Sequence, residues 1–121
     1  MKIIEKYIAR LTKSICIKTG KEYFTDNFRN FKYKQKDGVL LITQDASETR
    51  FKWHPLLQKE DSGEIEVDAL KGIASSPIIK KTLKSHSQLI IETVYSIYYF
   101  SIEVTQDVDE ILNNMVIKIY M

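Results

Sequence analysis

The alternation of apolar and polar positions is clearest over residues 38–55. An uninterrupted apolar run at residues 39–42 is followed by a polar segment at residues 44–48, which predicts a turn. Phe51 and Trp53 then alternate with polar neighbours, which is the period of two expected for a strand with one buried and one wet face. Pro55 cannot donate to a β-ladder. We therefore predict a β-hairpin whose second strand leaves the sheet at its rim.

The N-terminal pattern allows two interpretations. Alternation over residues 6–11 and again over residues 14–18 predicts two short strands, with Cys16 as a small buried hydrophobic residue in the second. A short N-terminal helix is the alternative, because one set of apolar residues also recurs at helical spacing: Ile3, Ile4, Tyr7, Ile8 and Leu11. The connection over residues 19–37 holds five aromatic residues, too many for a solvated linker, so we expect it to pack against the domain.

The pattern between Pro55 and residue 104 predicts one short strand and a final hairpin. Residues 56–62 resemble a loop, and residues 64–68 alternate as a strand with an acidic outer face. Residues 70–84 contain Gly72 and Pro77 and predict an irregular loop or a single helical turn. Residues 88–94 and 97–104 are rich in β-branched and aromatic residues and predict two strands joined by a tight reversal at residues 95–96.

The last segment predicts an amphipathic helix. Thr105 can cap its N-terminus, and six apolar residues then share one face: Val108, Ile111, Leu112, Met115, Val116 and Ile119. The sum is a mostly β fold with one C-terminal α-helix, in which about seven strands form a bent sheet or small barrel that the helix caps. This arrangement resembles pleckstrin-homology architecture. At 121 residues we expect a single domain over residues 1–121.

Composition narrows the class of function. The net charge of +2 is too small to indicate nucleic-acid binding, and the 18 Lys and Arg residues are spread along the chain. No apolar run is long enough to cross a membrane, and no secretory signal is visible, so we expect an intracellular protein. With two histidines and one cysteine, no metal-ligand set is evident, and we predict neither a metal site nor another cofactor.

Catalytic chemistry has little support in the sequence. A nucleophile with a base and an orienting group, or a pair of carboxylates in a cleft, is the usual requirement. His54 and His86 have no identifiable acidic partner, and the acidic residues near position 66 are more simply a solvated strand face. We therefore expect a binding module rather than an enzyme.

Residues 51–55, Phe-Lys-Trp-His-Pro, following the apolar strand at residues 38–42, resemble the Pru domain family, the pleckstrin-like receptors for ubiquitin of the proteasome. Residues 6–11 resemble the first strand of that family, and residues 97–103 resemble its aromatic-rich last strand. The resemblance covers nearly the whole chain. It implies a cytoplasmic and nuclear, non-enzymatic subunit of the proteasome regulatory particle that docks on the apolar C-terminal tail of the large scaffold subunit. The separate domain that recruits a ubiquitin hydrolase in that family is not expected here.

The resemblance also implies two sets of contact residues. By position, the contacts to the scaffold tail fall on Phe31, Lys32, Tyr33 and Phe100. The family's contacts to ubiquitin come from rim loops, where apolar and acidic groups meet ubiquitin's hydrophobic patch, and the corresponding residues here are Asp68, Leu70 and Ile73. The match in that loop is incomplete because no phenylalanine occurs between residues 67 and 80.

One alternative is a pleckstrin-like adaptor that binds a phosphoinositide or another protein. Lys13, Lys18 and Lys21 would supply the positive charge for a lipid headgroup, although no arginine accompanies them. The three lysines at positions 80, 81 and 84 are interpreted as part of a solvated loop.

Overall fold

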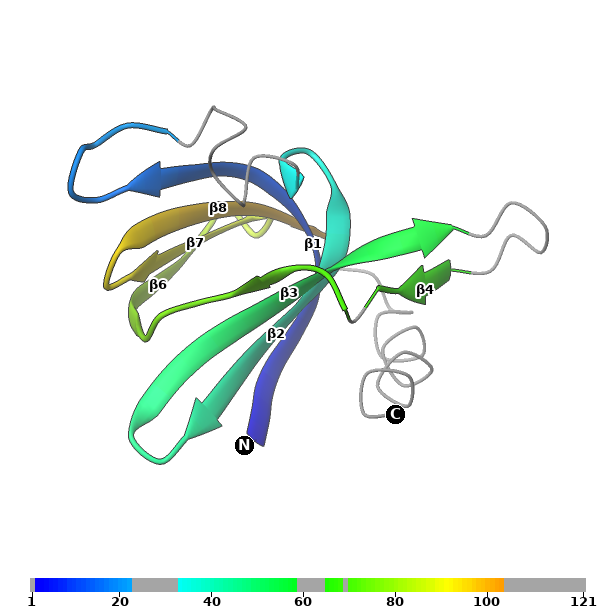
Figure 1. The fold of residues 1–121 in the computed structure, drawn as a ribbon, viewed down its shortest axis with the longest axis horizontal. Coiled ribbons are helices and arrows are strands. Elements are labelled where there is room, and N and C mark those ends of the chain that lie inside the picture. Colours follow the sequence, from blue (N-terminus) through cyan, green and yellow to red (C-terminus); the bar gives the residue numbers. More distant parts are fainter. Residues whose placement is uncertain (1, 23–32, 59–64, 69, 104–121) are drawn as a thin grey trace.

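The computed structural model describes residues 2–22, 33–58, 65–68 and 70–103. These residues form eight β-strands in one antiparallel sheet (Figure 1). In chain order the strands are β1 (Lys2–Cys16), β2 (Asp37–Asp45), β3 (Glu48–Gln58), β4 (Ile65–Val67), β5 (Ile73–Ala74), β6 (Ile78–Lys84), β7 (Gln88–Thr93) and β8 (Ser96–Glu103). The spatial order is β4-β3-β2-β1-β8-β7-β6, and β5 pairs with β3.

The long strand β1 joins the two halves of the sheet. Its residues Lys2 to Arg10 pair with β2, and its residues Ile8 to Cys16 pair with β8. The register shifts once in each ladder, and such bulges bend a strand. Figure 1 shows β1 passing from the side of β2 into the side of β8 and β7. The result is a bent sheet that the described strands do not close into a barrel.

The main core lies on one face of this bent sheet. Alternate residues of the strands supply it, as the period of two predicts, and its largest fully buried side chains include Trp53, Phe51 and Phe100. Phe51 packs edge-on against Tyr98, with ring centroids 4.9 Å apart, and against Phe100 at 5.6 Å. Aromatic pairs of this geometry add roughly 0.5–1.5 kcal/mol beyond their buried area.

A second apolar cluster lies on the opposite face. Val39 and Leu41 alternate with the core residues of β2 and are also buried, and Val67 completes the cluster. Ile3, Ile8 and Leu56 pack against it. The run at residues 39–42 therefore lacks alternation because both of its faces are buried.

Several sequence predictions are confirmed. The first hairpin turns between Asp45 and Glu48, and the last turns between Thr93 and Ser96. The Thr93 hydroxyl closes this last turn, since it donates to the carbonyl of Ser96 at 3.0 Å and accepts from the backbone N–H of Ser96. β4 occupies the middle of the strand predicted at residues 64–68, and the fold is mostly β. The predicted C-terminal helix from Thr105 lies outside the described residues.

The predicted strand character of the two N-terminal segments is confirmed, but their division into two strands and the helical alternative are wrong. One strand of 15 residues spans both segments, because a bulge near Thr12 absorbs the break in alternation without ending the pairing. Cys16 is the last residue of this strand and is half-buried.

Two predicted loops are also wrong. β3 does not end at Pro55 but continues to Gln58, where its last residues pair with β4. The carbonyl of Pro55 accepts a hydrogen bond from the backbone N–H of Asp68 at 3.0 Å, which ties the chain to the end of β4 at the proline. The loop predicted at residues 70–84 contains β5 and β6, which the pattern missed because residues 79–84 are all exposed and show no buried face.

Candidate functional site

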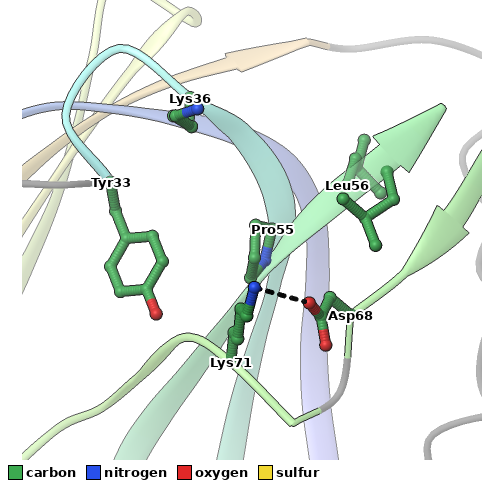
Figure 2. A pocket seen from close by; sticks show the side chains of 7 residues that line it. Tyr33, Lys36, Pro55, Leu56, Asp68 and Lys71 are labelled. Carbon is green, nitrogen blue, oxygen red and sulfur yellow. Dashed lines mark ion pairs between the residues drawn. The ribbon is translucent and has the colours of Figure 1, made fainter.

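A pocket of about 280 Å³ lies where the second half of β3 meets the segments around residues 33–36 and 68–71. Figure 2 shows the side chains that surround it. Seven residues line the pocket: Tyr33, Lys36, Pro55, Leu56, Leu57, Asp68 and Lys71. Its volume is slightly below the roughly 300–1,000 Å³ typical of small-molecule sites, which favours one or two side chains of a protein partner over a cofactor.

Tyr33 forms one wall of the pocket and is firmly positioned. Its ring packs edge-on against Trp53, with centroids 5.3 Å apart. Its hydroxyl accepts a hydrogen bond from the backbone N–H of Gly72 at 3.1 Å. The main chain of the same turn is tied to β1, because Gln35 donates to the carbonyl of Leu11 at 2.6 Å and Lys36 accepts from Leu11.

Trp53 supports the pocket from inside the core. Its side chain is fully buried, and its indole Nε1–H donates to the carbonyl of Ala9 at 3.0 Å. Two glycines make room for this arrangement. A Cβ at Gly38 would overlap the indole ring, and a Cβ at Gly72 would overlap the backbone carbonyl of Trp53. The tryptophan therefore fixes both segments that frame the pocket.

Asp68 organises the opposite wall. Its Oδ1 accepts from the backbone N–H of Leu70 at 3.3 Å, and its carbonyl accepts from the N–H of Lys71 at 3.1 Å. Its Oδ2 lies 3.7 Å from the Lys71 Nζ, an ion pair drawn in Figure 2. The carbonyl of Lys71 is in turn 2.8 Å from the His54 Nδ1. Local bonds of an aspartate to the main chain two residues on are typical of ordered turns.

This turn presents an unusually exposed apolar side chain. Leu70 is 98% exposed although its backbone is hydrogen-bonded to Asp68, and Leu57 on the rim of the pocket is 48% exposed. Scattered exposed leucines are common, but here Leu57 lines a pocket that also holds Asp68, and Leu70 lies in the turn that Asp68 organises. The arrangement suits contact with an apolar patch of another protein.

The structure brings together residues that the resemblance assigned to different partners. Tyr33, expected to contact the scaffold tail, and Asp68, expected to contact ubiquitin, line the same pocket. Leu70 belongs to the turn that Asp68 organises. Phe31 and Lys32 lie outside the described residues.

Two of the expected contact residues belong to the core. Phe100 has no exposed surface, and Ile73 is only 5% exposed. In this conformation neither side chain offers area to a partner, so both act through packing. The alternation of Phe100 with Tyr98 and Ile102 was the available signal for its inward direction.

Four lining residues were missed by the sequence analysis. Leu56, Leu57 and Lys71 were not singled out because residues 56–62 and 70–84 were interpreted as loops, and Lys36 was part of the connection over residues 19–37. The pair Leu56-Leu57 carries a usable signal once these residues are placed on a strand. Neighbouring strand residues face opposite sides, and Leu56 packs on the second apolar cluster while Leu57 is exposed.

The residues considered for other chemistry are dispersed. Lys13 lies over the ring of Tyr99, with Nζ 5.4 Å from the centroid, and Lys18 and Lys21 are exposed after the end of β1. Over the described ranges, three or more His, Cys, Asp or Glu side chains nowhere gather as a metal-binding group would. In the same ranges we find no helix with the length and apolar character to cross a membrane.

Comparison with known proteins gives no relative: no protein-family model, curated protein or solved structure matches this chain.

Proposed function

We propose that this chain is a non-enzymatic, pleckstrin-like binding module of the proteasome regulatory particle, and that the turn with Asp68 and Leu70, on one side of the pocket, binds ubiquitin. The observation that carries the proposal is the exposed Leu70, whose backbone N–H is bonded to Asp68 and which lies in sequence between the lining residues Asp68 and Lys71. An apolar residue paired with an acidic residue is what the resemblance to Pru domains implies for contact with ubiquitin's hydrophobic patch.

Pre-ordering supports a binding role for this turn. Ordering a loop and its side chains on association costs free energy, so a turn already fixed by hydrogen bonds binds more tightly than a disordered one. The turn at Asp68 has such bonds from the N–H groups of Leu70 and Lys71, and its own N–H donates to Pro55. Leu70 thus combines an ordered main chain with a fully available side chain.

The second part of the proposal concerns the scaffold tail. Among the residues expected to contact the scaffold tail, Tyr33 is described by the structure and lines the pocket. The exposed Lys36 lines the same wall of the pocket. An aromatic wall with a flanking cation suits an apolar peptide that carries a carboxylate. Phe100 has no surface for this role, and we leave it out of the proposed contact.

The proposal is tested by purifying the tagged chain from its native cells and identifying the proteins that accompany it. We expect regulatory-particle subunits and ubiquitin conjugates with the unaltered chain. Leu70→Asp should lose the ubiquitin conjugates and keep the regulatory particle, whereas Lys36→Glu should weaken recovery of the regulatory particle.

A matched control separates binding from folding. Ile17→Asp introduces the same charge at another exposed apolar position, after the end of β1, and should keep both partners. Recovery of no regulatory-particle subunits with the unaltered chain would overturn the proposal.

A further inference from the structure

β6 is an end strand of the sheet. In the strand order, β2, β1, β8 and β7 lie between it and β3, which lines the pocket. Within the described residues its ladder is formed with β7 alone, from the pair Ile78 and Thr93 to the pair Lys84 and Gln88 (Figure 1). An antiparallel strand with one neighbour directs about half of its backbone N–H and C=O groups away from that neighbour. This edge is therefore able to accept another strand.

The side chains of β6 combine lysines with large exposed apolar residues. Residues 79–84 are all exposed, and among them Ile79 is 65% and Leu83 is 53% exposed. Natural edge strands usually avoid large exposed apolar residues, because such an edge invites pairing with other chains. Two on one short strand indicate a surface that is covered in use.

A neighbouring turn extends this apolar surface. Val94 and Tyr95, in the turn between β7 and β8, are 45% and 71% exposed. The backbone N–H of Val94 donates to the carbonyl of Pro77 at 3.2 Å, which places this turn beside the start of β6. We refer to β6 together with Val94 and Tyr95 as the β6 edge.

The charge of the β6 edge defines the chemistry of a partner. The strand carries Lys80, Lys81 and Lys84, and Lys81 forms an ion pair with Glu5 of β1. Lys80 and Lys84 have no ion pair among the described residues, and they lie on the face of the strand opposite to Leu83. An incoming strand would therefore meet Leu83 and the ion-paired Lys81 on one face, and the positive charges of Lys80 and Lys84 on the other.

We propose that the β6 edge binds an extended segment of a partner protein in which apolar and acidic residues alternate. The segment adds to the sheet as a further strand, so that main-chain hydrogen bonds supply affinity. The apolar side chains of the segment pack on Leu83 and Ile79, and its acidic side chains pair with Lys80 and Lys84. A second copy of β6 is disfavoured as the occupant, since antiparallel self-pairing would bring its lysines together. This proposal is independent of the pocket beside Asp68.

The test uses the full chain and a short acetylated peptide of alternating valine and glutamate. Backbone amide shifts and amide hydrogen exchange are recorded by NMR during titration. We expect shift changes centred on residues 79–84 and slower exchange of amides in β6. A peptide with lysine in place of every glutamate, and one with proline at alternate positions, should both fail to bind.

Variants locate the interaction. The double substitution Lys80→Glu with Lys84→Glu should weaken the valine–glutamate peptide about tenfold or more, because the charge complementarity is reversed. The matched control Lys2→Glu, an exposed lysine on β1, and Leu70→Asp in the proposed ubiquitin site should leave its affinity unchanged.

Four outcomes would overturn the proposal. Two concern the peptides: equal binding of the glutamate and lysine peptides, or no binding of the glutamate peptide. The third is dimerisation of the chain through β6 in sedimentation analysis. The fourth is displacement of the bound peptide by anionic vesicles that occupy the same residues.

Discussion

The hydroxyl of Tyr33 accepts a hydrogen bond from the backbone N–H of Gly72 at 3.1 Å. This bond joins the turn that precedes β2 to the segment that precedes β5, two parts of the chain that are distant in sequence. Because Tyr33 lines the pocket and Gly72 follows Lys71, another lining residue, the bond helps to fix the width of the pocket.

Tyr33→Phe should loosen this connection without removing the aromatic wall. The N–H of Gly72 loses its partner, and a lost hydrogen bond of this kind costs about 1 kcal/mol. We expect a small decrease in the free energy of unfolding and faster hydrogen exchange at the Gly72 amide. Unchanged exchange at Gly72, measured beside a distant reference amide such as Leu89, would show that the bond contributes no protection.

Gly72→Ala should destabilise the fold more than Gly20→Ala. Both glycines have positive φ angles, of 133° and 70°, which L-residues adopt at a cost. A Cβ at Gly72 would in addition overlap the carbonyl of Trp53, whereas a Cβ at Gly20 meets open space. We expect losses of about 3 kcal/mol and about 1 kcal/mol, respectively, in urea denaturation. Equal losses would contradict the close approach of the Gly72 segment to β3.

Trp53→Phe should cost about 2–3 kcal/mol of unfolding free energy, since it leaves the Ala9 carbonyl without its donor and a gap in the core. The Nε1 to Ala9 oxygen distance of 3.0 Å and the complete burial of the ring are the basis for this value. As a control, Tyr95→Phe removes a polar group from a side chain that is 71% exposed and should change stability by less than about 0.5 kcal/mol. A similar effect of the two substitutions would argue against the structural role of the indole.

Lys81 should make stability depend on pH in the alkaline range. The Lys81 side chain is 33% exposed beside Glu5, and partial burial of its ammonium lowers the pKa of Lys81 below its ordinary value of 10.5. Between the lowered pKa and 10.5 the unfolded chain binds the proton more tightly than the folded protein, so the free energy of unfolding should rise as the pH increases through this range. The Lys81→Gln variant should lack this rise in the free energy of unfolding. Denaturation curves recorded at several alkaline pH values for both proteins provide the comparison, and identical pH profiles would contradict it.

Local patterns predicted the parts of the fold in which one face of a strand is buried. Phe51 and Trp53 alternate with polar residues and point into the core, and the last hairpin follows the same rule. Helical spacing at the N-terminus was misleading because Ile3 and Ile8 pack on one face of the sheet while Tyr7 packs on the other.

Other elements could not be predicted because their stability comes from distant pairing. β6 has an exposed, lysine-rich sequence and is a strand because it pairs with β7. Pro55 ends many strands, but here the chain continues to pair with β4 beyond it. The pocket could not be predicted either, since Tyr33, Leu57 and Asp68 come together only through tertiary structure.

Titration of ubiquitin into the isotopically labelled full chain, followed by NMR, tests the central proposal most directly. We predict saturable shift changes at Leu57, Asp68, Leu70 and Lys71. Leu70→Asp should weaken binding about tenfold or more while leaving the unfolding free energy unchanged, because its side chain is 98% exposed. Ile79→Asp should bind ubiquitin like the unaltered protein. Absence of shift changes around the pocket at saturating ubiquitin, or equal binding by the Leu70→Asp variant, would contradict the assignment of this site.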